Sequence, residues 1–222
     1  MRRNFIIVWI IMTVMCMGAG IVTRMSFKNY AELKKDKMDS FIAAVNPINE
    51  ESVNKEISEI EKKAEVIVRI KCVGEREYLH EAVLSKVEIT EVYKGGENIL
   101  FNDNDRYIYV YEPCFFNFEK EYFMSVGAYN LMRENEEYIL YLNRKDFPPE
   151  YKLSEKEGKE YVLTTHDTFS NYPVSQEYQV KIVGEEEELA YGEIKNYEAL
   201  FREVEMLELY DAFKTKLFQG IQ

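Results

Sequence analysis

Residues 66–74 read VIVRIKCVG, and the alternation within them decides the fold. Successive side chains of a β-strand point to opposite faces, so every second residue shares one face. This pattern predicts a half-buried strand from Glu65 to Val73. Four side chains share its apolar face: Val66, Val68, Ile70 and Cys72.

The same alternation recurs further along the chain. Strands are expected at 82–93 (AVLSKVEITEVY), 106–112 (RYIYVYE) and 137–143 (EYILYLN), with further candidates at 160–165 and 177–183. Within 106–112 the pattern separates two faces, because three tyrosines alternate with two aliphatic residues. The tyrosines are Tyr107, Tyr109 and Tyr111, and the aliphatic residues are Ile108 and Val110. Together the strands predict a barrel domain over 64–195.

Helical patterns flank these strands. Residues 25–63 are expected to form a helical stalk, interrupted at Pro47 and including a helix from Glu50 to Lys63. In the last segment, 196–222, apolar residues recur at i, i+3 and i+4, which predicts an amphipathic helix from Asn196 to Phe218. Such a helix either covers the core or binds a partner. The expected fold class is therefore α+β, with a small antiparallel β-barrel flanked by helices.

The N-terminal segment 1–24 predicts membrane targeting. From Phe5 to Val22 there are 18 residues without a charge, and Arg2 and Arg3 precede them. A helix of this length approaches the hydrocarbon thickness of a bilayer, and the positive residues favour a cytoplasmic N-terminus. A transmembrane anchor with the domain outside the cell is expected. The alternative is a cleaved signal, with small residues at 18–20, and a secreted protein.

The order of these patterns resembles a group of exported bacterial proteins. The resemblance rests on VIVRIKCVG, then LSKVEITEVYKGGE, then YIYVYEP, then ENEEYILYLNR, and it covers about Glu50 to Val183. Members of the group carry a small five-stranded barrel of OB-like or netrin/TIMP-like type, so the resemblance implies that fold. TIMP-like inhibitors depend on an N-terminal cysteine after signal cleavage, and this chain has none at that place. The resemblance therefore implies no protease-inhibitor role.

Composition and motifs exclude several chemistries. The chain carries 28 basic and 40 acidic residues, a net charge of −12, which disfavours a nucleic-acid partner. Two histidines, His80 and His166, are too few for a histidine-rich metal site, and no phosphate-binding loop, dinucleotide fingerprint or nucleophile elbow occurs. We expect no metal and no cofactor, and an enzyme is not the favoured interpretation.

Two cysteines of the outer domain, Cys72 and Cys114, are candidates for a disulfide in an oxidising compartment. The alternative is that each is a free thiol, because Cys72 continues the apolar face of its strand.

Residues 113–132 join two expected strands through an unusually aromatic stretch, PCFFNFEKEYFMSVGAYNLM. If exposed, its rings would form a contact patch for protein, peptide or glycan; if buried, they would cap the end of the barrel. The candidate contact residues are Phe115, Phe116, Phe118, Tyr122, Phe123 and, on the tyrosine face, Tyr109.

The leading hypothesis is therefore a membrane-tethered extracytoplasmic binding module with a cell-envelope protein or glycan as its partner. One alternative is an envelope hydrolase that uses carboxylates such as Glu112 and Glu119. Another is a structural subunit of an envelope complex that binds through its C-terminal helix.

Overall fold

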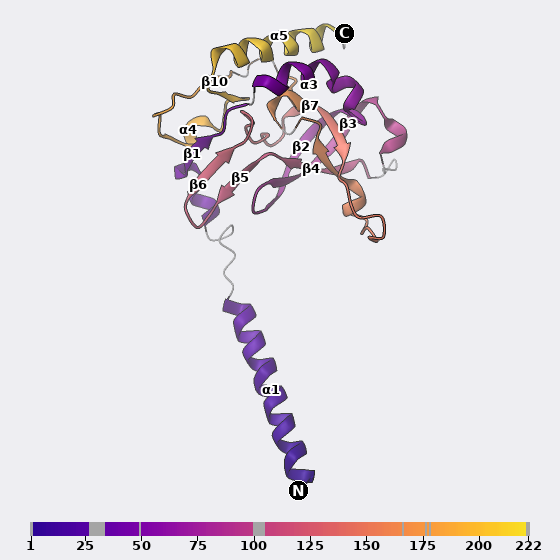
Figure 1. Ribbon diagram of the computed structural model, residues 1–222, viewed down its shortest axis with the longest axis vertical. Coiled ribbons are helices and arrows are strands. Elements are labelled where there is room, and N and C mark those ends of the chain that lie inside the picture. Colours follow the sequence, from indigo (N-terminus) through magenta and orange to yellow (C-terminus); the bar gives the residue numbers. More distant parts are fainter. Residues whose placement is uncertain are drawn as a thin grey trace. The chain divides into compact units, whose positions relative to one another are not determined.

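The computed structural model describes residues 2–26, 34–48, 50–99, 105–165, 167–175, 177 and 179–220. The chain divides into two compact units, Met1–Asp36 and Lys37–Gln222. The first contains one long helix and the second contains the sheets and the remaining helices (Figure 1).

The helices of the described residues are α1 (Arg2–Ser26), α3 (Glu50–Lys63), α4 (Tyr191–Ile194) and α5 (Val204–Gly220). Short 3-10 helices are η1 (Lys35–Ser40), η2 (Gly96–Asn98), η3 (Glu157–Lys159) and η4 (Thr168–Ser170). The longer strands are β2 (Val66–Tyr78), β3 (Val83–Lys94), β4 (Tyr107–Glu112) and β7 (Glu137–Arg144). The shorter strands are β1 (Ile42–Val45), β5 (Cys114–Asn117), β6 (Tyr122–Ser125), β8 (Glu160–Leu163), β9 (Asn171–Pro173), β10 (Lys181–Ile182), β11 (Leu189–Ala190) and β12 (Leu200–Phe201).

Five strands close into a barrel in the order β2-β3-β4-β8-β7, and β7 pairs back onto β2. The α+β class and the barrel are thereby confirmed. Four of the five seams are antiparallel, but β4 and β8 pair in parallel, with Tyr109 opposite Glu160. The expectation of a wholly antiparallel barrel was wrong at this seam. Strands joined by a hairpin must pair antiparallel. Because β5, β6 and β7 separate β4 from β8 in the sequence, this pair is free to be parallel.

Strand β2 is longer than its apolar pattern predicts. It continues past Val73 to Tyr78 because Gly74, at φ +81°, belongs to an irregularity in the pairing with β3 and does not end the strand. A bulge of this kind bends a strand and increases its twist, so β2 can pair with both β3 and β7 around the barrel. The predicted inner face is confirmed, since Val66, Val68 and Ile70 are completely buried.

Strand β4 separates its two faces as its sequence predicts. Ile108 and Val110 are completely buried inside the barrel, whereas Tyr107, Tyr109 and Tyr111 are half-buried on the outside. The outer face of β4 therefore presents a row of tyrosine rings.

A second sheet, ordered β11-β1-β6-β5, is built from segments expected to be stalk and loop. The helical stalk over 25–63 is wrong at β1, which pairs in parallel with β6 and antiparallel with β11. Phe41, just before β1, is completely buried, and burying it ties this segment to the domain. Helix α3, also part of 25–63, is confirmed from Glu50 to Lys63.

The C-terminal helix is shorter than expected. Helix α5 begins at Val204, and Leu200 and Phe201 instead form β12, which pairs in parallel with β10. Both residues are buried, so the extended segment places in the core the same apolar side chains that a helix was expected to bury. Helices α3 and α5 lie together at one end of the barrel (Figure 1) and share an apolar core with the barrel strands. The strand expected at 177–183 is reduced to β10, outside the barrel.

Helix α1 is continuous over the predicted targeting segment. Its described apolar side chains are exposed, including Trp9 at 64% and Met17 at 64%. Among the residues that the structure describes, no helix meets the length and apolarity needed to cross a membrane. The side chains of Phe5 and Val8 lie outside the described residues.

Candidate binding grooves

A buried polar network fills one end of the barrel around Glu112. The Glu112 side chain is completely buried, and its Oε2 accepts hydrogen bonds from the Tyr129 hydroxyl and the Met132 amide, both at 2.8 Å. Its Oε1 accepts a hydrogen bond from Ser85. Burial raises the pKa of Glu112, against the opposing effect of the nearby Arg76 guanidinium. With both carboxylate oxygens occupied, Glu112 ties strands together.

Arg76 completes this network from β2. Its Nε donates to Ser85 Oγ at 3.2 Å, and its Nη2 donates to the Met132 carbonyl oxygen. The same Nη2 lies 3.5 Å from Cys72 Sγ. The network therefore connects β2, β3, β4 and the segment that follows β6, which is the arrangement expected of a satisfied structural network.

The two carboxylates considered for hydrolysis do not converge. Glu112 is enclosed in the barrel, whereas Glu119 is exposed in the turn between β5 and β6. A water molecule cannot be activated by the pair in the manner of a glycosidase, because only one of them faces solvent.

The candidate disulfide is not formed, because Cys72 and Cys114 are both free thiols. Each is completely buried, and burial raises the pKa of both. The free-thiol alternative therefore describes this structure.

The aromatic stretch forms the β5–β6 hairpin, and most of its rings are buried. Phe116, Phe118 and Phe123 are at most 8% exposed and pack in a cluster with Phe41 and Tyr191. These three residues form the core of the second sheet, so their rings are not available to contact a partner. Burial was the alternative to an exposed patch, and Phe116 and Phe118 also pack against Tyr78, the last residue of the barrel strand β2.

Phe115 and Tyr122 lie on the opposite face of the hairpin. Their ring centroids are 6.1 Å apart, and both side chains are half-buried. Tyr109, the remaining candidate, lies on the outer face of β4.

A groove of about 450 Å³, termed the tyrosine groove, runs over that outer face. Its lining residues are Lys86, Asp105, Tyr107, Tyr109, Ser154, Glu155, Lys156 and Lys159. They come from β3, from β4 and the residue Asp105 just before it, and from the connection between β7 and β8. Sequence analysis identified only the tyrosines, because nothing in the sequence of 145–159 indicates that this connection folds back over β4.

Lysine ammonium groups lie over the tyrosine rings. Lys86 Nζ is 4.6 Å from the centroid of the Tyr107 ring, and Lys156 Nζ is 5.1 Å from that of Tyr109. At these distances a cation is attracted to the negative ring face. The next tyrosine, Tyr111, has Lys145 Nζ 4.1 Å from its ring centroid.

Each of these lysines also has a carboxylate partner. Lys86 Nζ lies 3.0 Å from Glu75 Oε2, and this hydrogen bond raises the lysine pKa. Lys156 pairs with Glu77, which likewise raises its pKa. The groove therefore presents ammonium groups, carboxylates and ring faces together, a combination that suits a polar ligand with many hydrogen-bonding groups.

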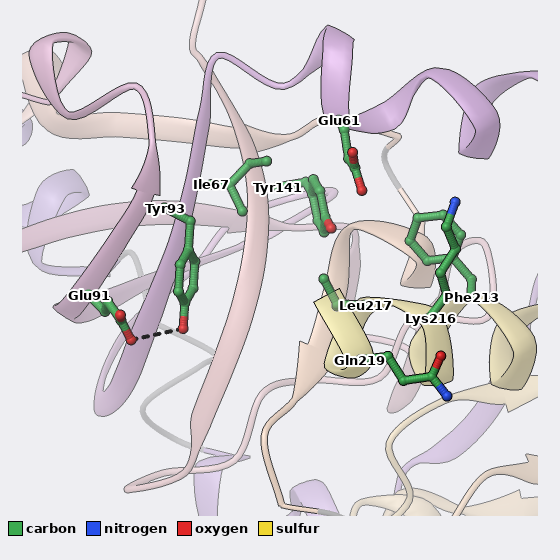
Figure 2. Close-up of a pocket in the computed structure, with 9 residues that line it drawn as sticks. All are labelled: Glu61, Ile67, Glu91, Tyr93, Tyr141, Phe213, Lys216, Leu217 and Gln219. Atoms are coloured by element: carbon green, nitrogen blue, oxygen red, sulfur yellow. Dashed lines mark hydrogen bonds between the residues drawn. The ribbon is translucent and has the colours of Figure 1, made fainter. Parts of the chain in front are cut away.

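A second groove, of about 670 Å³, lies where α3 and α5 meet the barrel. We call it the helix groove, and Figure 2 shows its lining residues. Tyr141 on β7 occupies a central place, and Glu61 reaches toward it from the last turn of α3. Phe213 and Leu217 of α5 form one wall, and Ile67 of β2 lies on the other side.

Tyr93 and Glu91 of β3 line the groove on the same side as Ile67, opposite the wall formed by α5. The Tyr93 hydroxyl donates to Glu91 Oε2 at 2.9 Å, as the dashed line in Figure 2 marks. Burial and this hydrogen bond raise the pKa of Tyr93. Burial also raises the pKa of Tyr141, with the negative charge of Glu61 adding to the effect. Both hydroxyls therefore remain protonated at neutral pH.

Neither groove contains a recognisable metal centre. Within the described ranges, no group of three or more His, Cys, Asp or Glu side chains is placed to hold a metal ion. The His80 side chain is 94% exposed and lies beside Glu81. His166 lies outside the described residues.

Comparison with protein-family models found no match for this chain, and comparison with curated proteins found none either.

Proposed function

We propose that the chain is a membrane-tethered extracytoplasmic binding module whose contact surface is the tyrosine groove. The observation that carries the proposal is the arrangement of Tyr107 and Tyr109, whose rings line a groove together with paired lysines and carboxylates. Groups of this kind stack on a partner and hydrogen-bond to it without performing chemistry. A cell-envelope protein or glycan is the class of partner that these groups suit.

The position of the groove supports an OB-like interpretation of the barrel. OB folds are five-stranded barrels that bind ligands on the face of strands 2 and 3, bordered by the loops between strands 1 and 2 and between strands 4 and 5. Counted along this barrel, β3 and β4 are the second and third strands, and the groove residues 154–159 precede the fifth. Fold likeness alone is weak evidence for function, so the groove residues carry the argument.

The proposed tether rests on the sequence of the N-terminal segment. The uncharged stretch from Phe5 to Val22 lies entirely within this one helix, and Arg2 and Arg3 stand at its start. The positive end would remain in the cytoplasm and the domain would lie outside. Cleavage near Ile21 would instead release a secreted protein. Mass spectrometry of the mature N-terminus distinguishes the two: a protein that begins near Ile21 contradicts the anchor.

The experiment on the groove is a crosslinking pull-down from intact membranes. We expect the double variant Tyr107→Ala, Tyr109→Ala to lose its partner while keeping the far-UV circular dichroism of the wild type. The matched control is Phe115→Ala, Tyr122→Ala, which removes two half-buried rings from the other sheet. Retention of the partner by the groove variant, or its loss only in the control, would contradict this assignment.

The alternative functions have less support. Helix α5 buries Met206 and Tyr210 in the core, so it belongs to the domain and does not stand free for a partner. Truncation before Asn196 should therefore unfold the domain. For a hydrolase, Glu112 has the wrong environment, since it is enclosed.

A further inference from the structure

We propose that the helix groove is a second binding site and that it takes a small organic ammonium compound, with an apolar body and a protonated amine. The site is distinct from the tyrosine groove, because the two share no lining residue. The groove combines apolar walls, one tyrosine hydroxyl and two carboxylates.

The walls suit an apolar body. Ile67, Phe213 and Leu217 are half-buried and line the groove, and the rings of Tyr93 and Tyr141 lie beside them (Figure 2). Covering this surface with a ligand would remove apolar area from water. Ring faces also attract a cation that lies within about 6 Å of their centroids.

Tyr141 provides a polar group at the centre of the site. Its side chain is only 1% exposed, it lines the groove, and among the described residues its hydroxyl makes no hydrogen bond. The hydroxyl lines the groove, so a ligand that supplies a donor would take the place of water as its hydrogen-bond partner. An ammonium group supplies N–H donors, and the phenol oxygen accepts them.

The surrounding charges favour a positive ligand. The Glu61 carboxylate faces Tyr141 and has no ion pair with another described residue, while Glu91 stands on the wall with Tyr93. Glu61 and Leu217 also belong to the last turns of α3 and α5, and helix C-termini carry partial negative charge. A protein cation already uses one of these ends, since Lys94 Nζ lies 2.6 Å from the Glu61 carbonyl oxygen.

Several protein cations oppose this field, and besides Lys94 they include Lys62 and Lys63 in the last turn of α3. Arg69, opposite Glu91 across the β2–β3 ladder, is engaged by Glu137, with its Nε 3.1 Å from the carboxylate. Lys216 is exposed at the rim and has no ion pair within the described residues. In this proposal Lys216 competes with an ammonium ligand for Glu61. Removing the charge of Lys216 should therefore strengthen the binding of a cation.

The test is calorimetric titration of the full-length protein in detergent with 2-phenylethylamine, which is protonated at pH 7, and with its neutral analogue 2-phenylethanol. We expect the amine to bind at least about tenfold more tightly, the factor that corresponds to one charge-assisted hydrogen bond of about 1.4 kcal/mol. Glu61→Gln should weaken amine binding by a similar factor and leave the alcohol unchanged. Tyr141→Phe should weaken it about threefold or more, because one hydrogen bond is lost. Lys216→Gln should tighten it.

Two matched controls locate the site. Glu208→Gln removes a carboxylate from an exposed position of α5 outside the groove, and Tyr107→Ala with Tyr109→Ala disables the other groove. Both should bind the amine as the wild type does. Equal binding of amine and alcohol, no binding at millimolar concentration, unchanged affinity of Glu61→Gln, or weaker binding by Lys216→Gln would each overturn the proposal.

Discussion

The hydroxyl of Tyr129 lies 2.8 Å from Glu112 Oε2, and both side chains are completely buried. This pair joins the last residue of β4 to the segment that follows the β5–β6 hairpin, so it links the barrel to the second sheet.

Tyr129→Phe should lower the free energy of unfolding by about 1–3 kcal/mol, because the buried carboxylate loses a donor and gains no replacement. Urea unfolding measures the change. The matched control is Tyr151→Phe, which removes a similar 2.8 Å tyrosine–glutamate hydrogen bond from the surface and should leave stability unchanged within error. Equal losses for the two variants would contradict a special role for burial.

Stability should depend on pH through Glu112. Its pKa is raised in the folded state, so folding favours the protonated form. The corresponding stability is fully present below the unfolded pKa of 4.5 and is lost as pH rises through the folded pKa. Relative to Glu112→Gln, the wild type should therefore lose stability from pH 4.5 toward neutrality in urea unfolding. Glu119→Gln, at an exposed position, should follow the wild type, and identical pH profiles for the wild type and Glu112→Gln would be evidence against the raised pKa.

Gly95→Ala should destabilise the domain by more than about 1 kcal/mol, because Gly95 has φ +73° and an added Cβ would clash with the Glu65 carbonyl oxygen. The neighbouring Gly96→Ala is the control, since its Cβ would meet only a side-chain atom at 3.6 Å. Thermal unfolding compares the two. A similar melting temperature for both variants would show that the turn after β3 tolerates the side chain.

The free thiols of Cys72 and Cys114 should resist modification in the folded protein, since both are buried and burial raises the pKa of each. In a Cys16→Ser background, a thiol reagent should label none of the remaining cysteines under native conditions. It should label two in denaturant without reductant. Labelling of none in denaturant would reveal a disulfide and contradict this structure.

Much of the barrel could be predicted because its strands carry a strong period of two. The inner faces of β2 and β4, and the outward tyrosines, follow directly from alternation. The parallel contact between β4 and β8 could not be predicted, since it depends on how the chain returns after β7. The extension of β2 beyond Gly74 was also not predicted. A glycine within a strand pattern is compatible both with a bulge and with the end of the strand.

The sites were harder to predict because they are assembled from distant segments. Tyr109 was identified from its strand, but Lys156 lies in a connection whose path only tertiary structure determines. In the helix groove, Glu61 and Tyr141 are 80 positions apart and come from different elements. Phe116 and Phe123 illustrate the opposite case, because an aromatic run is compatible with either a surface patch or a core, and here the second sheet buries it.

The place of β1 has a mechanical consequence. A force applied through the N-terminal segment would reach η1 first and then β1, which lies between β6 and β11 and not at the edge of its sheet. Extraction of β1 would have to break backbone hydrogen bonds on both sides and withdraw Phe41 from its aromatic cluster. Under the proposed tether, such a load would reach β1 before it reached the barrel strands that bear the tyrosine groove.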